Sequence, residues 1–179
     1  MQRIGILLFL LMFCFATAMQ AQAPTPKPNP EVKKLQPHLG HWTYDGESKP
    51  SPLGPGGKFT GEMTCQMILG GFFMQCRFTE NGPSGETHAL ALEGYDPVNK
   101  NLFYETYDDS GIRSSGVITI TGKTWTYEGR SGERQVKSTI VLAPDLASGE
   151  LKFEISSDGK TWTPVGETNY TKVQPAAKK

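Results

Sequence analysis

The most constraining feature of this sequence is a succession of short segments rich in Val, Ile, Thr, Phe, Tyr and Trp, separated by Gly, Asp, Asn and Pro, which begins at Gly40. No window of a dozen residues shows the 3.6-residue periodicity of an amphipathic helix. Short segments of this composition, bounded by turn residues, are typical of β-strands. The sequence therefore predicts about ten strands, over residues 40–46, 58–69, 72–80, 86–95, 101–107, 114–121, 124–130, 134–142, 150–157 and 160–172.

Short turns join these predicted strands. Gly70-Gly71 and Asp158-Gly159 suit two-residue hairpins that need positive φ, and Gly122-Lys123 suits a type II′ turn. The exception is a longer, Gly/Pro-rich connection over residues 47–57. Consecutive hairpins produce an up-and-down antiparallel sheet, and closure into a barrel removes its two exposed edges. The expected fold is therefore an all-β, up-and-down barrel, preceded by a short helical turn within residues 31–39.

The N-terminal residues are interpreted as a secretory signal peptide over residues 1–18. A basic residue near the start, an apolar run over residues 4–16 and the small residues Ala16-Thr17-Ala18 have the order that signal peptidase requires. The apolar run is shorter than the ~20 residues of a spanning helix, which disfavours an uncleaved anchor. A lipid anchor on Cys14 is the other alternative, and the bulky Phe13 argues against it. We expect an exported protein, periplasmic or secreted, with no stable membrane anchor.

A single domain is expected after this segment, because 179 residues leave little room for two. The alternating prolines from Pro24 to Pro30 predict an extended linker over residues 19–34. The barrel domain is assigned to residues 35–173, and residues 174–179 form a short basic tail.

Cys65 and Cys76 are the two cysteines that remain if Cys14 leaves with the signal peptide, and an exported protein folds in an oxidising compartment. A hairpin that turns at Gly70-Gly71 places Cys65 opposite Cys76, at a Cα distance of about 5.5 Å that a disulfide tolerates. We expect this disulfide to form. The alternative is a pair of buried free thiols that act as small apolar side chains.

Charge and motifs argue against several function classes. The 18 Lys and Arg residues balance the 18 Asp and Glu residues, so the basic surplus that nucleic-acid binding needs is missing. The sequence contains no G-x-S-x-G, no H-E-x-x-H and no phosphate-binding glycine loop, and its three histidines do not cluster. We therefore expect no nucleic-acid partner, no metal and no cofactor, and no enzyme class is indicated. The sequence gives no indication of oligomeric state.

Aromatic residues on the predicted strands are the candidates for contact with a ligand. Tyrosines that share a strand face with apolar residues can orient a ligand through their hydroxyl groups while the cavity wall stays mainly apolar. The alternative is that each tyrosine packs in the core with its hydroxyl at the rim. The candidate ligand-binding residues are Tyr44, Tyr104, Tyr127 and Phe72.

Three short motifs resemble those of known barrel families. Leu39-Gly40-His41-Trp42 is similar to the G-x-W opening of lipocalins and fatty-acid-binding proteins, the calycin barrels. With Leu69-Gly70-Gly71-Phe72-Phe73 and Glu93-Gly94-Tyr95-Asp96-Pro97, it resembles a family of exported bacterial proteins catalogued only as a domain of unknown function. The resemblance covers residues 35–172 and implies a lipocalin-like barrel.

The resemblance also implies roles for individual residues. Trp42 closes one end of the barrel, and Lys172 stacks over it where lipocalins usually carry Arg, which is the better planar stacker. The related haem-binding nitrobindins ligate iron through a histidine on a late strand. No histidine follows His88 in this chain, so haem is not expected.

The leading functional hypothesis is an exported protein that holds a small apolar or amphipathic molecule inside its barrel. The alternative is a barrel packed solid with side chains, which acts through its outer face as an interaction or structural module. The interior volume separates the two hypotheses, because bulky Phe, Trp, Met and Tyr side chains could fill a ten-stranded barrel.

Overall fold

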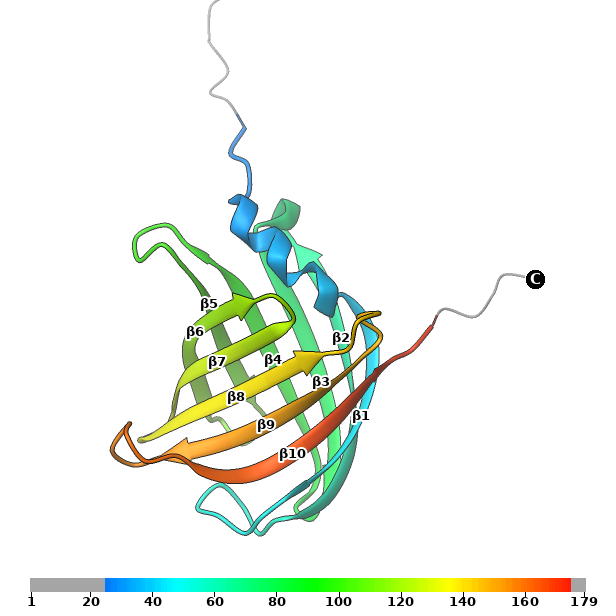
Figure 1. Ribbon diagram of the computed structural model, residues 1–179, viewed down its shortest axis with the longest axis vertical. Helices are drawn as coiled ribbons and strands as arrows, with labels where there is room; N and C mark the ends of the chain where they lie inside the picture. Colours follow the sequence, from blue (N-terminus) through cyan, green and yellow to red (C-terminus); the bar gives the residue numbers. More distant parts are fainter. Residues whose placement is uncertain (1–24, 175–179) are drawn as a thin grey trace, which may run out of the picture.

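Ten antiparallel strands close into a barrel in the computed structural model, which describes residues 25–174 (Figure 1). Each strand pairs with its neighbours in the chain, and the first strand pairs with the last, with Trp42 opposite Lys172. This arrangement confirms the predicted all-β, up-and-down barrel. The strands are β1 (Gly40–Ser48), β2 (Gly57–Ile68), β3 (Phe73–Gly82), β4 (Gly85–Asp96), β5 (Asn101–Asp108), β6 (Arg113–Thr121), β7 (Thr124–Ser131), β8 (Arg134–Leu142), β9 (Ser148–Ser156) and β10 (Thr163–Lys172).

Side chains alternate between the barrel interior and the solvent because successive residues of a strand point to opposite faces. In β1, Trp42 and Tyr44 are buried, whereas Thr43 and Asp45 between and after them are exposed. The largest group of buried side chains lies at one end of the barrel, near the first residues of β1. Its members include Val32, Leu35, Trp42, Met63, Met74, Leu102, Ile118, Trp125, Ile140 and Leu142.

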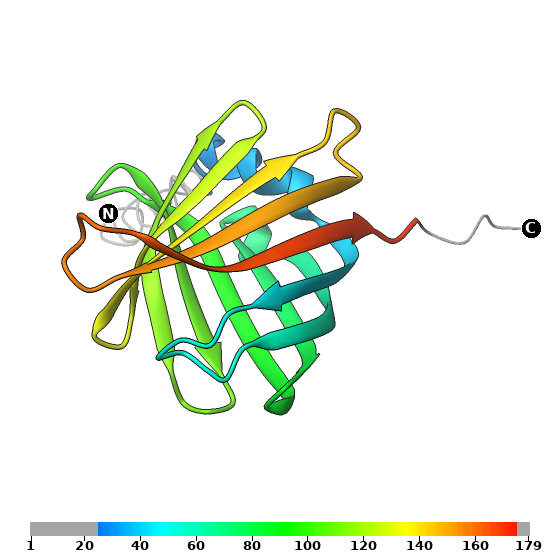
Figure 2. The ribbon, with the colours of Figure 1, turned by 60° about the horizontal axis from the view of Figure 1, so that its bottom comes forward.

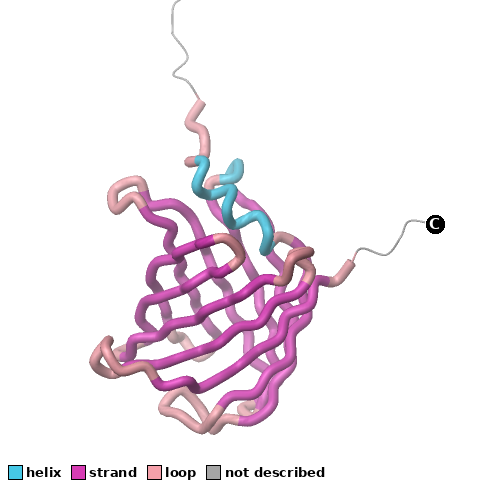
Figure 3. Tube along the Cα trace, viewed as in Figure 1, coloured by secondary structure: helices cyan, strands magenta, loops and turns pink. Residues whose placement is uncertain are grey.

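A short 3-10 helix, η1 (Pro30–His38), lies across this end of the barrel (Figures 1 and 3). Val32, Leu35 and His38 are its buried residues. They recur every three positions, which places them on one side of a helix with three residues per turn. The packed part of the chain therefore begins at Pro30, inside the segment that the sequence assigns to a linker.

The start of η1 is fixed by local chemistry. The side chain of Asn29 accepts a hydrogen bond of 2.9 Å from the backbone N–H of Glu31, which satisfies one of the free donors at a helix start. Pro30 follows, at a position where a missing N–H costs nothing. The segment 1–24, which includes the predicted signal peptide, lies outside the described residues. Within residues 25–174, no helix is long and apolar enough to cross a membrane.

The connection between β2 and β3 differs from the predicted two-residue turn. Strand β2 ends at Ile68, a single 3-10 turn, η2 (Leu69–Gly71), follows, and β3 starts at Phe73. Leu69 and Gly70 both adopt positive φ, 49° and 69°, and this widens the connection. The register further along the hairpin is the predicted one, with Cys65 opposite Cys76.

The two ends of the barrel differ. The connections β1–β2, β3–β4, β5–β6, β7–β8 and β9–β10 lie at the end opposite η1, as the view in Figure 2 shows. Among the described residues, that end carries no helix, whereas η1 lies across the other (Figure 1).

Candidate ligand-binding cavity

A cavity of about 260 Å³ lies inside the barrel beneath η1. Its wall combines aliphatic, aromatic and a few polar side chains from η1 and from all ten strands. The central part of the wall is formed by Met63, Phe78, Tyr104, Tyr127, Ile140, Leu151, Phe153 and Tyr170. A further space of about 390 Å³ adjoins this cavity on the side away from η1, because both are bounded by Phe78, Leu151 and Phe153. The barrel is therefore not packed solid with its own side chains.

The lumen continues toward the open end of the barrel. A space of about 570 Å³ there is bounded by the β1–β2 connection, including Leu53 and Pro55, and by Pro83 and Ser84 between β3 and β4. Tyr44, Phe59, Phe78 and Glu80 are shared with the neighbouring space, so the three spaces adjoin one another from the cavity beneath η1 toward this end.

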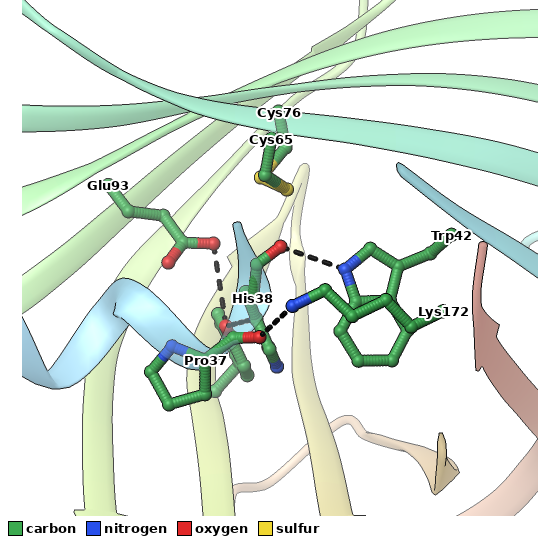
Figure 4. Close-up of a disulfide and its surroundings, with 8 residues drawn as sticks. Pro37, His38, Trp42, Cys65, Cys76, Glu93 and Lys172 are labelled. Atoms are coloured by element: carbon green, nitrogen blue, oxygen red, sulfur yellow. Dashed lines mark hydrogen bonds between the residues drawn. A yellow bond between two sulfur atoms is a disulfide. The ribbon is translucent and has the colours of Figure 1, made fainter. Parts of the chain in front are cut away.

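Trp42 and Lys172 lie together at the closed end, where the family resemblance implies them. Trp42 is 1% exposed, and its indole N–H donates a hydrogen bond of 2.9 Å to the carbonyl oxygen of His38. The Nζ of Lys172 lies 5.0 Å from the centre of the indole ring and donates a bond of 3.3 Å to the carbonyl of Pro37 (Figure 4). A cation over an indole face is attracted by the ring quadrupole. Both contacts tie the end of η1 to the barrel.

The hydroxyl group of Tyr127 joins an acid and a base in the cavity wall. It donates a hydrogen bond of 3.4 Å to Oε1 of Glu93 and lies 3.4 Å from Nδ1 of His38. Figure 4 shows the carboxyl group of Glu93 turned toward the region of His38. The other oxygen of Glu93, Oε2, is buried and has no hydrogen-bond partner among the described residues. Buried polar atoms without partners are rare in folded proteins, so this oxygen requires an explanation.

Burial shifts the pKa values of these groups in the directions that keep them neutral. Desolvation raises the pKa of Glu93 to about 8, against a smaller opposing effect of the bond from Tyr127. Desolvation also lowers the pKa of His38 to about 4, and the charge of Lys172 adds to this effect. The pKa of Tyr127 is raised well above its usual value by burial and by the nearby carboxyl group of Glu93. At neutral pH the cavity wall therefore presents three uncharged hydrogen-bonding groups.

The imidazole ring of His38 is held by stacking. Its centroid lies 3.9 Å from that of the Trp125 ring, with the two planes 20° apart. Trp125 is 1% exposed and belongs to β7, two residues before Tyr127. The same strand therefore orients the histidine ring and supplies the hydroxyl group that contacts it.

The predicted disulfide is confirmed. Cys65 on β2 and Cys76 on β3 are bonded, with Cα atoms 4.1 Å apart, and both are buried inside the barrel. The Cα distance is shorter than predicted, and is close to the about 4.5 Å of the narrower type of antiparallel pair. Cys76 also forms part of the cavity wall.

The sequence-predicted ligand-binding residues lie in different places. Tyr104 and Tyr127 line the cavity, with their rings edge to face and their centroids 5.5 Å apart. Tyr44 lines the lumen nearer the open end, 5.3 Å from the ring of Tyr170. Phe72 follows the η2 turn between β2 and β3 and does not line the cavity.

Sequence reasoning did not select His38 and Glu93, although both belong to the cavity wall. Glu93 shares its strand face with Ala91, which is buried, so the period of two was a signal that could have identified it. His38 follows Leu35 by three residues, the spacing of the buried face of η1. That signal becomes readable only once the helix is known to be of the 3-10 type.

A closed, up-and-down barrel with a G-x-W first strand, a covered end and an internal cavity defines the lipocalin-like, or calycin, class of proteins. The chain matches the family described as "Protein of unknown function (DUF1579)" over residues 27–172, and it belongs to this family. The resemblance to a family of unknown function with a lipocalin-like barrel is therefore confirmed.

Solved structures share the fold. The crystal structure of Rv2717c from M. tuberculosis has a TM-score of 0.60 at 15% identity, and the match covers 83% of this chain and 100% of that one. The S-type phycobiliprotein lyase CPES from Guillardia theta has a TM-score of 0.50 at 9% identity, covering 82% of this chain and 93% of the lyase. At these identities the likeness concerns the fold alone. No curated protein matches the sequence.

Proposed function

We propose that this protein binds a small molecule with a mainly apolar body inside the barrel. The observation that carries the proposal is the open cavity beneath η1, with the buried, unpartnered Oε2 of Glu93 in its wall. A bound ligand would provide the missing partner for this oxygen. Each ~100 Å² of apolar ligand surface buried against the wall would contribute about 2.5 kcal/mol, before the entropy of association is subtracted.

Tyr104 and Tyr127 are proposed as the residues that orient the ligand. Their hydroxyl groups belong to a wall that is otherwise largely aliphatic and aromatic. A few polar groups in an apolar cavity are the usual arrangement in sites for small molecules. Tyr44, nearer the open end, would contact a ligand that extends toward solvent.

We further propose that the protein acts after export. The apolar segment and small residues within 1–18 have the order of a signal peptide. The disulfide between Cys65 and Cys76 is the type of bond that persists in oxidising compartments. Intact-mass analysis of the exported protein tests this proposal. A chain that starts near Met19 without an acyl group is expected, whereas a lipidated Cys14 would overturn it.

Two measurements test ligand binding. Native mass spectrometry of protein purified from its own host should detect a co-purifying small molecule. An uncharged fluorescent probe, N-phenyl-1-naphthylamine, should brighten saturably when titrated with the purified protein. Absence of any bound mass, together with a probe that stays dark at micromolar protein, would overturn the proposal.

Matched variants locate the binding site. Tyr104→Phe combined with Tyr127→Phe should weaken binding of the co-purified ligand severalfold, because the orienting hydroxyl groups are lost. Tyr107→Phe is the control, since Tyr107 is 43% exposed and its hydroxyl group bonds to Glu105 outside the cavity. Equal binding by the double variant and the control would exclude the two tyrosines from the site.

A further inference from the structure

We propose that the cavity selects amphipathic amines, molecules with an apolar body and one protonated amino group that lies against the carboxyl group of Glu93. This inference rests on the proposed ligand-binding function and adds the charge of the ligand. Three features of the lumen support it: the unpartnered carboxylate oxygen, the distribution of charge along the lumen and the aromatic wall.

The carboxyl group of Glu93 offers an acceptor that nothing in the described chain uses. The residue is 5% exposed, Oε1 accepts from Tyr127, and Oε2 has no partner. An ionised carboxylate only accepts hydrogen bonds, and an ammonium group only donates them. A protonated amine in the cavity would therefore satisfy Oε2 with a charge-assisted bond, the stronger kind of hydrogen bond.

The charges along the lumen disfavour an anionic ligand. Among the described residues that line the cavity, Glu93 is the one acid and no Lys or Arg is present. Lys172 is close by, but its Nζ bonds to the carbonyl of Pro37 above the indole ring. A fatty-acid carboxylate at this place would find no cation to neutralise it, and its desolvation would be uncompensated.

The spaces between the cavity and the open end are acidic as well. Glu80, Asp108 and Asp109 border the space at the open end, whereas Lys49 is the only Lys or Arg among the described residues that border the two outer spaces. A cleft lined by charges of one sign raises the local concentration of the opposite charge. Cationic molecules are therefore favoured from the mouth of the barrel to the cavity beneath η1.

The wall around Glu93 is suited to a cation that has lost its water. Tyr104 and Tyr170 line the cavity with Tyr127, and Phe78 and Phe153 lie further toward the open end. The faces of aromatic rings attract cations, and the attraction is stronger when water is excluded. The aliphatic wall then accommodates the apolar body of the ligand.

Binding of an ammonium group would favour the ionised form of Glu93, so the carboxyl group would release its proton. The titratable groups that face it are Tyr127 on β7, Tyr104 on β5 and, through Tyr127, His38 on η1, with Lys172 and Tyr170 on β10 behind them. The opposing residue on β3 is Met74, which does not titrate.

Because burial raises the pKa of Glu93 to about 8, amine affinity should increase up to about tenfold per pH unit as the pH rises from 6 to 8.

Three probes with the same apolar tail test the selectivity: decylamine, decanol and decanoic acid. Each is titrated against the protein loaded with N-phenyl-1-naphthylamine, at pH 6, 7 and 8, and the loss of fluorescence is measured. Decylamine is expected to displace the reporter at concentrations at least tenfold lower than the other two at pH 8. Its affinity should increase with pH, whereas that of decanol should stay constant.

The outcomes separate this inference from the proposed function. If none of the three probes displaces the reporter and the reporter itself does not bind, binding of apolar molecules in the barrel is refuted. If decanol or decanoic acid binds as tightly as decylamine, or if decylamine shows no pH dependence, the cavity binds apolar molecules and the selectivity for amines is refuted.

Variants of two glutamates assign the selectivity to one carboxyl group. Glu93→Gln keeps the size and the bond from Tyr127 but removes the charge, and it should reduce decylamine affinity at least tenfold while leaving decanol affinity unchanged. Glu150→Gln, at an exposed position of β9, should leave both affinities unchanged. Unchanged decylamine binding by Glu93→Gln would overturn the inference. The pH series on the unmodified protein decides the question independently of how the variant folds.

Discussion

Tyr127 lies between an acid and a base that burial affects in opposite directions. Removing a charged group from water costs free energy whichever sign the charge has, so burial favours the protonated form of Glu93 and the deprotonated form of His38. Both groups are then neutral, and the hydroxyl group between them contacts each at 3.4 Å. The cavity wall thus presents hydrogen-bonding groups that carry no charge at neutral pH.

Glu93 should make the stability of the protein depend on pH. The folded protein retains a proton that the unfolded chain releases between the ordinary pKa of 4.5 and about 8, so the free energy of unfolding decreases as the pH rises through this window. The lowered pKa of His38 makes the free energy of unfolding increase with pH, but only below the ordinary histidine pKa of 6.5. Between pH 6.5 and 8 the free energy of unfolding of the unmodified protein should therefore decrease by about 1–2 kcal/mol. That of Glu93→Gln should not show this decrease.

Urea unfolding of the two proteins at pH 6.5 and 8 measures this difference. The effect of His38 on stability is common to both proteins. The difference between their free energies of unfolding therefore reports the carboxyl group of Glu93 alone. Stability curves that run parallel from pH 6.5 to 8 would show that Glu93 is already ionised in the folded state.

At the scale of single elements, the β2–β3 hairpin is held by a covalent bond within the barrel wall. The disulfide between Cys65 and Cys76 closes a short loop, which restricts the unfolded chain more than the folded one. Replacement of both cysteines by alanine should lower the free energy of unfolding by roughly 2–3 kcal/mol. Urea denaturation of the oxidised protein and of the variant gives the difference. Equal midpoints would mean that the hairpin is as constrained without the bond.

Strands β6 and β7 carry a pair of glycines at opposing positions. Gly116 lies opposite Gly129, and a methyl group on Gly116 would collide with the carbonyl oxygen of Glu128. Gly116→Ala should therefore destabilise the barrel by about 1–3 kcal/mol, the usual effect of overpacking. The control is Gly166→Ala on β10, where the nearest atom would be at an ordinary 3.6 Å. Thermal unfolding of the two variants tests the difference, which a common melting temperature would contradict.

The sequence is informative about the elements because strand signals are local. Alternation of buried and exposed residues, with turn residues between, locates all ten strands to within a few residues. The connection at Gly70-Gly71 is predicted too short, since positive φ is uncommon for a residue other than glycine and is not expected of Leu69. The pairing of Cys65 with Cys76 was still correct, because a turn lengthened equally on both sides keeps the register.

The site was less predictable than the strands. Tyr104 and Tyr127 could be selected from alternation alone, because each shares a strand face with apolar residues. His38 reaches the cavity only because η1 folds back over the barrel, a contact between segments far apart in the sequence. Glu93 could not be separated from solvent-exposed acids by its residue type, since isolated carboxyl groups are seldom buried.

At the scale of the whole molecule, η1 covers one end of the barrel, and the other end is the proposed entrance for a ligand. Leu35 lies on the buried side of this helix and is fully buried. Leu35→Ala should lower the free energy of unfolding by about 2–5 kcal/mol, because it leaves a cavity between η1 and the strands. It should also accelerate release of the bound reporter, since the cover of the barrel is loosened.

Lys33→Ala provides the matched control, because Lys33 is exposed on the same helix. Stopped-flow dilution of the loaded reporter gives the release rate, and urea denaturation gives the stability. If Leu35→Ala and Lys33→Ala release the reporter at the same rate, η1 does not control access to the lumen.

The pairing of β1 with β10 sets the time at which folding can finish. The two strands are the first and the last of the barrel, so this contact spans the largest sequence separation in the fold. Contacts of this kind slow folding, since a long loop must be closed before they form. During synthesis, a chain that lacks β10 exposes two sheet edges able to pair with other chains. Wherever the chain folds, the barrel therefore cannot close until β10 is present beside β1.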